Sequence, residues 1–100
     1  MDLQELLEGI ETLSEAPGAT GEVSSVCYAA QQCSPGSLFV AIAGTVHDGH
    51  DFISEAIGRG ARCIVHHRDI TVPEGIASVR VADSRRALGV IAKNFYRAPS

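Results

Sequence analysis

PGSLFVAIAGTVHDGH, from Pro35 to His50, decides the fold of this chain. It opens with a Pro-Gly turn signal and continues through six uncharged apolar residues, Leu38 to Ala43. Such a run is typical of a strand buried on both faces, and a short buried helix has the same pattern. A polar loop bracketed by glycines, Gly44 to His50, follows. Loops at the carboxyl ends of such strands hold ligands in α/β proteins, and helix N-termini favour anions.

The flanking sequence alternates between helical and strand patterns. Apolar residues at helical spacing predict a short helix that starts near Leu3 and ends near Gly9. The other predicted elements are strands over 23–28, 62–66 and 78–82, helices over 51–57 and 84–95, and loops over 14–22 and 67–74. In the first strand, Val26 and Tyr28 alternate with Ser25 and Cys27. The order α, β, β, α, β, β, α predicts an α/β fold, a small mixed β-sheet flanked by helices.

The two longer helices carry start signals and inner faces. His50 or Asp51 is expected to cap the first helix, whose apolar face is Phe52, Ile53, Ala56 and Ile57. Asp83 or Ser84 is a good N-cap for the second. Asp83-Ser84-Arg85 is therefore interpreted as a helix cap, with Arg85 and Arg86 exposed.

Composition and charge exclude several classes of protein. One hundred residues, 45% of them hydrophobic, make one small domain with a real core. The net charge is −4 and the basic residues are scattered, which argues against a nucleic-acid surface. No apolar run approaches the roughly 20 residues that span a bilayer. The acidic N-terminus lacks the basic region of a signal peptide, so we expect a cytoplasmic protein.

The cysteines and histidines do not form a recognisable catalytic or metal motif. Cys27, Cys33 and Cys63 are odd in number, which gives no disulfide framework. Cys27 and Cys33 have the wrong spacing for a zinc knuckle, and Cys63 is expected to be a small core residue. His66 and His67 are interpreted as structural histidines. We therefore expect no metal site and no catalytic residue in this chain.

Asp48-Gly49-His50 resembles a catalytic motif, but each residue has a simpler role. Asp48 is expected to hydrogen-bond to local backbone in the turn, and Gly49 to supply a special backbone angle.

Five segments follow one another in a recognisable order. They are P-G-x-L-F-V-A-x-x-G at 35–44, D-G-H-x-F-I at 48–53, A-I-x-x-G-A at 56–61, D-S-R-x-A-L at 83–88 and F-Y-x-x-P-S at 95–100. Together they resemble the N-terminal domain of the Mur ligases and cover 24–100. The match is closest to the ligases that add the third residue of the peptidoglycan stem peptide.

The resemblance implies a fold of the Mur ligase N-terminal type and one part of a three-domain ATP-dependent ligase. That enzyme would phosphorylate the terminal carboxylate of UDP-MurNAc-L-Ala-D-Glu and join meso-diaminopimelate, or lysine in some relatives, to it. Residues 1–100 would be the domain that binds the UDP-precursor. ATP and Mg²⁺ would belong to the central and C-terminal domains, because no G-x-x-x-x-G-K-[ST] occurs here. We expect a domain junction at Ala98-Pro99-Ser100, and no ligase activity from this chain alone.

The resemblance also carries over a site for the UDP moiety: Tyr28, Ala30, Thr45, Val46 and His47. The family's Asp-Ser-Arg segment is replaced here by Ala29-Ala30-Gln31. Backbone groups at Tyr28 and Ala30 can still contact the uracil, and the Tyr28 ring can pack on it. The loop Thr45 to His47 would cradle the diphosphate with backbone N–H groups and side-chain donors.

Other interpretations remain open from the sequence. Tyr28 can be a strand residue with one face in the core, and the glycine-rich loop can be an ordinary connection. The chain can be the equivalent domain of the ligase that adds D-Ala-D-Ala. It can also be a non-catalytic interaction module that has lost the nucleotide site, as the Ala29-Ala30-Gln31 replacement suggests.

Overall fold

A mixed five-stranded sheet forms the centre of the computed structural model, which describes residues 3–16, 23–42, 52–67 and 75–97. The strands are β1 (Thr12–Ala16), β2 (Ser25–Cys27), β3 (Ser37–Val40), β4 (Cys63–His66) and β5 (Ala77–Val81), in the spatial order β1-β5-β4-β3-β2. β2 to β5 run parallel, and β1 pairs antiparallel with β5. The predicted small mixed sheet is confirmed.

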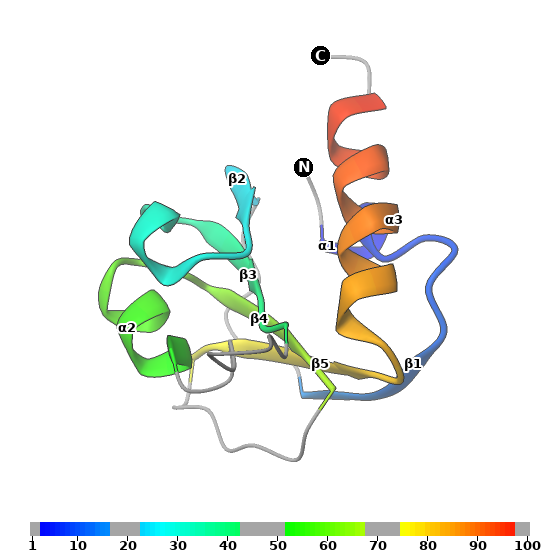
Figure 1. Cartoon of the computed structure of the whole chain (residues 1–100), viewed down its shortest axis with the longest axis horizontal. Coiled ribbons are helices and arrows are strands. Elements are labelled where there is room, and N and C mark those ends of the chain that lie inside the picture. The colour runs from blue at the N-terminus through cyan, green and yellow to red at the C-terminus, as the bar shows by residue number, and fades with distance from the viewer. Residues whose placement is uncertain (1–2, 17–22, 43–51, 68–74, 98–100) are drawn as a thin grey trace.

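Helices cover both faces of this sheet (Figure 1). The short helix α1 (Leu3–Leu6) and the long helix α3 (Ser84–Arg97) lie together on one face. Helix α2 (Ile53–Gly58) and the 3₁₀ turn η1 (Ala30–Gln32) cover the other. Two apolar cores result, one on each side of the sheet.

Strand β3 has side chains in the apolar cores on both faces of the sheet, as its unbroken apolar run predicts. Leu38 and Val40 pack with the cluster under α1 and α3, whereas Phe39 and Ala41 pack with the cluster under α2. All four are fully buried. The alternation within one strand excludes the short buried helix that the same sequence pattern allowed.

The predicted turn before β3 is present and interlocks with the end of α2. The Ser37 amide donates to the Ser34 carbonyl at 3.0 Å, and Gly36 has φ +85°. These features define a type II turn with Pro35 and Gly36 at its centre. The Gly36 amide donates to the carbonyl of Gly60, which itself has φ +111°.

Strand β1 corrects the predicted loop over 14–22. Residues 14–16 belong to this strand, and 17–22 lie outside the described residues. Ser, Glu and Ala are poor strand formers, so the sequence has no local strand signal here. The strand exists because the exposed edge of β5 offers backbone partners, with a register shift between Thr12 and Ser14.

Strand β2 is shorter than the predicted 23–28 and faces differently. It ends at Cys27, which is buried under α2, and Tyr28 lies beyond it and is exposed. The interpretation of Tyr28 as a strand residue with one face in the core is therefore wrong. The alternating pattern predicted that Tyr28 faces the core, but the buried residue is Cys27.

Helix α3 has a side-chain cap at its N-terminus, and helix α2 has none. The Asp83 carboxylate accepts hydrogen bonds from the Arg85 and Arg86 amides at 3.0 and 3.2 Å, which confirms the predicted cap. The helical pattern is expected from Asp51, whereas helix α2 begins at Ile53, with Phe52 at its N-cap position and no side-chain cap. Of the expected caps, His50 and Asp51 lie outside the described residues.

Candidate functional site

A cavity of about 270 Å³ opens where β2 and β3 end. Parallel strands place the residues that follow them at one edge of the sheet, and this edge is the usual ligand site of an open α/β sheet. The lining combines the segment after β2, the end of β3 and the start of α2: Tyr28, Ala29, Ala30, Gln31, Phe39, Ile42, Phe52 and Glu55.

Two aromatic rings on separate elements border this cavity. Tyr28 is 59% exposed and follows β2, and Phe52 is 38% exposed and precedes α2. Large exposed aromatic side chains are unfavourable in water, so a pair beside one cavity is a ready surface for a planar apolar ring. Gln31 and Glu55 add a carboxamide and a carboxylate to the same lining.

Small buried side chains hold the segment that follows Tyr28 against the core. Ala30 is 5% exposed and packs with Cys27 and Cys33 under η1. The Gln32 and Cys33 amides donate to the carbonyls of Ala29 and Ala30 at 2.9 and 3.0 Å. The turn therefore buries its small residues and leaves its larger polar and aromatic side chains at the cavity.

The structure brings together part of the predicted site. Tyr28 and Ala30 line the same cavity, although the Ala30 side chain also belongs to the core below. Thr45, Val46 and His47 lie outside the described residues, as do Asp48 and Gly49.

Sequence reasoning missed the aromatic and acidic side chains that α2 brings to the lining. Glu55 was not considered, and Phe52 was assigned to the inner face of α2, whereas it is exposed at the cavity. The available signal was that Phe52 stands before the first turn of its helix. A residue at that position faces the strand ends rather than the sheet.

A second cavity, of about 370 Å³, lies beside the start of α3 and shares Ile42 with the first. Its polar lining includes His67, Asp83, Ser84 and Arg85. His67 Nδ1 lies 2.9 Å from the hydroxyl of the buried Ser84. Asp83 caps the helix and Arg85 is exposed, as the sequence predicts. His66 is buried in β4, which agrees with a structural role.

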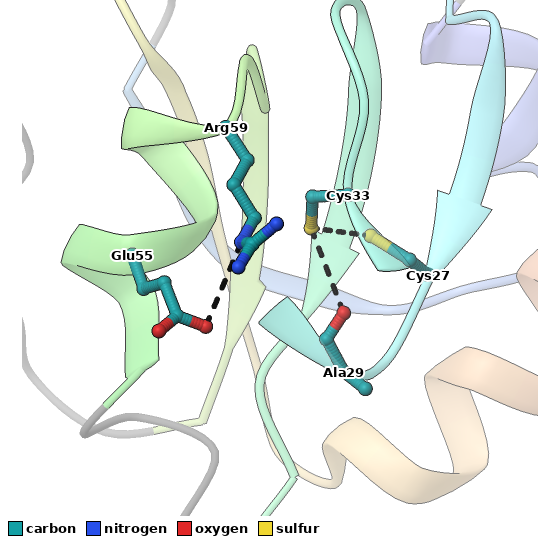
Figure 2. A network of polar contacts seen from close by, with 5 residues as sticks. All are labelled: Cys27, Ala29, Cys33, Glu55 and Arg59. Atoms are coloured by element: carbon teal, nitrogen blue, oxygen red, sulfur yellow. Dashed lines mark hydrogen bonds and ion pairs between the residues drawn. The ribbon is translucent and has the colours of Figure 1, made fainter. Parts of the chain in front are cut away.

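Cys27 and Cys33 lie in direct contact next to the first cavity (Figure 2). Their sulfur atoms are 2.7 Å apart, and both thiols are buried. Burial, followed by the neighbouring Cys33, raises the pKa of the Cys27 thiol far above its ordinary value. Burial also raises the pKa of Cys33. Cys63 is buried in the core on the opposite face of the sheet, which confirms its predicted core role.

The described residues offer no donor set for a metal ion and no membrane span. No three His, Cys, Asp or Glu side chains come together within them. Among the same residues, no helix has the length and apolar character needed to cross a bilayer.

A family model, similar sequences and solved structures all match this chain to Mur ligases. The family model for the "Mur ligase family, catalytic domain" matches residues 22–96. The UDP-N-acetylmuramoyl-L-alanyl-D-glutamate--2,6-diaminopimelate ligase of Caldanaerobacter subterraneus subsp. tengcongensis is 40% identical over 101 residues. The protein of the same name from Alkaliphilus metalliredigens is 36% identical over 100 residues. Each match covers 100% of this chain and 20% of the relative.

Solved structures of MurF show the same fold. One from Acinetobacter baumannii superposes with a TM-score of 0.74 at 23% identity, covering 91% of this chain and 20% of that one. One from Thermotoga maritima, in complex with ADP, gives a TM-score of 0.61 at 30% identity, covering 71% and 16%. The chain thus spans about one fifth of the length of the relatives that it matches.

Proposed function

Because this chain belongs to the Mur ligase family, we propose that it is the N-terminal, precursor-binding domain of a cytoplasmic ATP-dependent ligase. The whole enzyme would add meso-diaminopimelate to UDP-MurNAc-L-Ala-D-Glu in peptidoglycan synthesis. The role of these 100 residues would be to hold the uridine end of that precursor. The central and C-terminal domains would be the partners of this one.

The cavity rimmed by Tyr28 and Phe52 is the observation that carries this proposal. Its volume of about 270 Å³ suits one planar ring better than a whole nucleotide sugar, since sites for drug-sized ligands usually exceed about 300 Å³. An exposed aromatic ring beside such a space stacks on a base without needing a particular base edge. Uracil would lie against Tyr28, with Gln31 within the same lining.

The diphosphate would lie at the loop Thr45 to His47, between β3 and α2. A loop rich in backbone N–H groups ahead of a helix is suited to phosphate oxygens. Ile42, the last described residue before this segment, lines the cavity. The Ala29-Ala30-Gln31 replacement shifts recognition of the base from a serine hydroxyl to ring stacking and backbone groups.

ATP and Mg²⁺ would be held outside these 100 residues. The sequence has no phosphate-binding lysine motif of the G-x-x-x-x-G-K-[ST] kind. We expect the chain alone to show no ATP turnover, and measurable turnover by the purified chain would contradict this assignment.

Two alternatives remain testable. The first is the equivalent domain of the ligase that adds D-Ala-D-Ala. The solved MurF structure shares the fold of this chain, and the relatives with 36–40% identity are diaminopimelate ligases. A non-catalytic module is favoured by the loss of Asp-Ser-Arg. Absence of uridine nucleotide binding would favour that module.

An NMR titration with UDP and with UDP-MurNAc-L-Ala-D-Glu tests the proposal, with AMP as the control ligand. We expect shifts at Tyr28 and Ala30 with both uridine compounds and not with AMP. Tyr28→Ala should weaken UDP binding at least about fivefold, because stacking on a base contributes roughly 1–3 kcal/mol. Tyr96→Ala is the matched control, since Tyr96 is 78% exposed on α3 and lies outside the cavity. Equal effects of the two variants would contradict the site.

A further inference from the structure

We propose that Cys27 and Cys33 are a redox modification site, at which a reversible disulfide fixes the segment that lines the cavity. The two cysteines bracket that segment: Cys27 ends β2, and Cys33 follows η1. Between them lie Tyr28 to Gln32. The bond would therefore join the two ends of the turn that presents Tyr28 and Gln31 to the cavity.

The geometry already brings the two sulfurs together. They are 2.7 Å apart, and a disulfide requires about 2.05 Å, so a shift of well under 1 Å closes the bond. The two side chains point toward each other (Figure 2), and both belong to the apolar cluster under α2. Cys63 lies in the core on the other face of the sheet and cannot reach either of them. The pairing is thus specified by the fold, although the sequence contains an odd number of cysteines.

The surroundings of the two thiols assign them different roles. Burial raises the pKa of both. At Cys33, however, the hydrogen bond from Cys27 and the positive charge of Arg59 act in the opposite direction and favour the thiolate, while Glu55 opposes them. Cys33 is also the more exposed of the pair, at 8% against 3%. Because Cys33 is the more exposed sulfur and has the positive charge of Arg59 near it, we expect Cys33 to react first and Cys27 to resolve the product.

A hydroperoxide is the oxidant that suits such a buried pair, because hydrogen peroxide is hardly larger than water. The Cys33 thiolate attacks one peroxide oxygen: the S–O bond forms, the O–O bond breaks, and hydroxide leaves with the proton that Cys33 gave up. The Cys27 thiol then attacks the Cys33 sulfur and gives up its proton as it does so. The S–S bond forms, the S–O bond breaks, and a second water leaves with the proton from Cys27. Two thiols are oxidised to one disulfide, and one peroxide is reduced to two waters.

The disulfide would restrain the cavity wall without occupying the cavity. A covalent link across so short a loop removes conformations that open the turn. Amide hydrogen exchange within Tyr28 to Gln32 should therefore slow by about tenfold or more on oxidation. The effect on uridine binding rests on the proposed function: a wall held in its bound shape binds more tightly.

Peptide mass mapping tests the site directly. The protein is treated with hydrogen peroxide, denatured, and its remaining thiols are alkylated. We expect a peptide with an internal Cys27–Cys33 bond, lighter by two hydrogens than the same peptide in its reduced form, together with an alkylated Cys63 and full reversal by dithiothreitol. The C63A variant should give the same disulfide, and C33S should give none. A cross-link that involves Cys63, or sulfinic acid at Cys33 with Cys27 still reduced, would overturn the proposal.

Two readouts keep this inference separate from the proposed function. The disulfide is measured by mass and by hydrogen exchange, which need no ligand. UDP titration of the reduced and oxidised protein then follows. If the disulfide forms and neither state binds UDP, the redox site stands and the uridine site fails. If UDP binds and no Cys27–Cys33 bond forms, the uridine site stands and the redox site fails.

Discussion

Gly60 shows how one residue without a side chain locks two elements together. A Cβ at Gly60 would lie 2.6 Å from Pro35 Cα and 2.8 Å from Pro35 N, and its φ of +111° is strained for any other residue. We expect Gly60→Ala to lower the free energy of unfolding by about 1–3 kcal/mol or more, measured by urea unfolding. Gly58→Ala is the control: nothing lies within 4 Å, so a gain of up to about 1 kcal/mol is expected. Similar effects at both positions would contradict the lock.

Cys27 gives the stability of the molecule a pH dependence. Its folded-state pKa is raised from the ordinary 9.0 by burial, so above pH 9 the unfolded chain loses a proton that the folded chain keeps. The folded state then binds more protons, and the free energy of unfolding falls as pH rises, by at most about 1.4 kcal/mol per unit. Below pH 9 both states are protonated and the thiol has no effect.

The measurement is urea unfolding in reductant at about pH 8 and about pH 10, near and beyond the usual thiol range. In the Cys27→Ala variant, the free energy of unfolding should fall less between the lower and the higher pH. An identical fall in the variant would mean that other groups cause it.

Helix α3 is the element whose start the sequence predicts best. Asp83→Ala removes the acceptor for the Arg85 and Arg86 amides, and we expect a loss of about 0.5–2 kcal/mol in the free energy of unfolding. Asp83→Asn keeps a capping oxygen and should retain most of that stability. Thermal unfolding of both variants checks this, and an equal loss in the two would point to charge rather than capping.

Elements with strong local signals were predictable, and those that depend on a neighbour were not. β3 and α3 carry an apolar run or a helical period with defined ends. β1 has neither, because its pairing comes from the free edge of β5. Phe52 was misplaced for a related reason: the helical period continues through it, but the helix begins at Ile53.

At the scale of the whole molecule, a side chain of the last helix binds the end of the first helix and the turn that follows it. Asn94 on α3 donates both amide hydrogens, to the carbonyls of Leu6 and Glu8, at 2.9 Å each. We expect Asn94→Ala to cost about 1–3 kcal/mol, because two helix-end carbonyls lose their partners. The neighbouring Lys93 is exposed, and Lys93→Ala should stay within about 0.5 kcal/mol of the parent. Urea unfolding compares them, and UDP binding should not change, since this contact lies across the sheet from the cavity.

At the same scale, the candidate site was only half predictable. Tyr28 and Ala30 were found because they align with a family segment. Glu55 joins them only through the crossover that returns the chain from β3 to α2, and no local pattern encodes that meeting. The sulfur pair was missed because spacing rules for metal knuckles do not describe two thiols folded beneath a turn.

The register shift in β1 also affects how copies of the molecule meet in concentrated solution. β1 is an edge strand, and at the shift it exposes 58% of Leu13. A straight edge with an apolar side chain is a template on which another chain can add a strand, and such addition propagates into aggregates. The extra residue between Thr12 and Ser14 bends that edge and breaks the regular spacing of its hydrogen-bonding groups. The register shift in β1, which is not part of the cavity, thus disfavours strand addition between copies of the molecule.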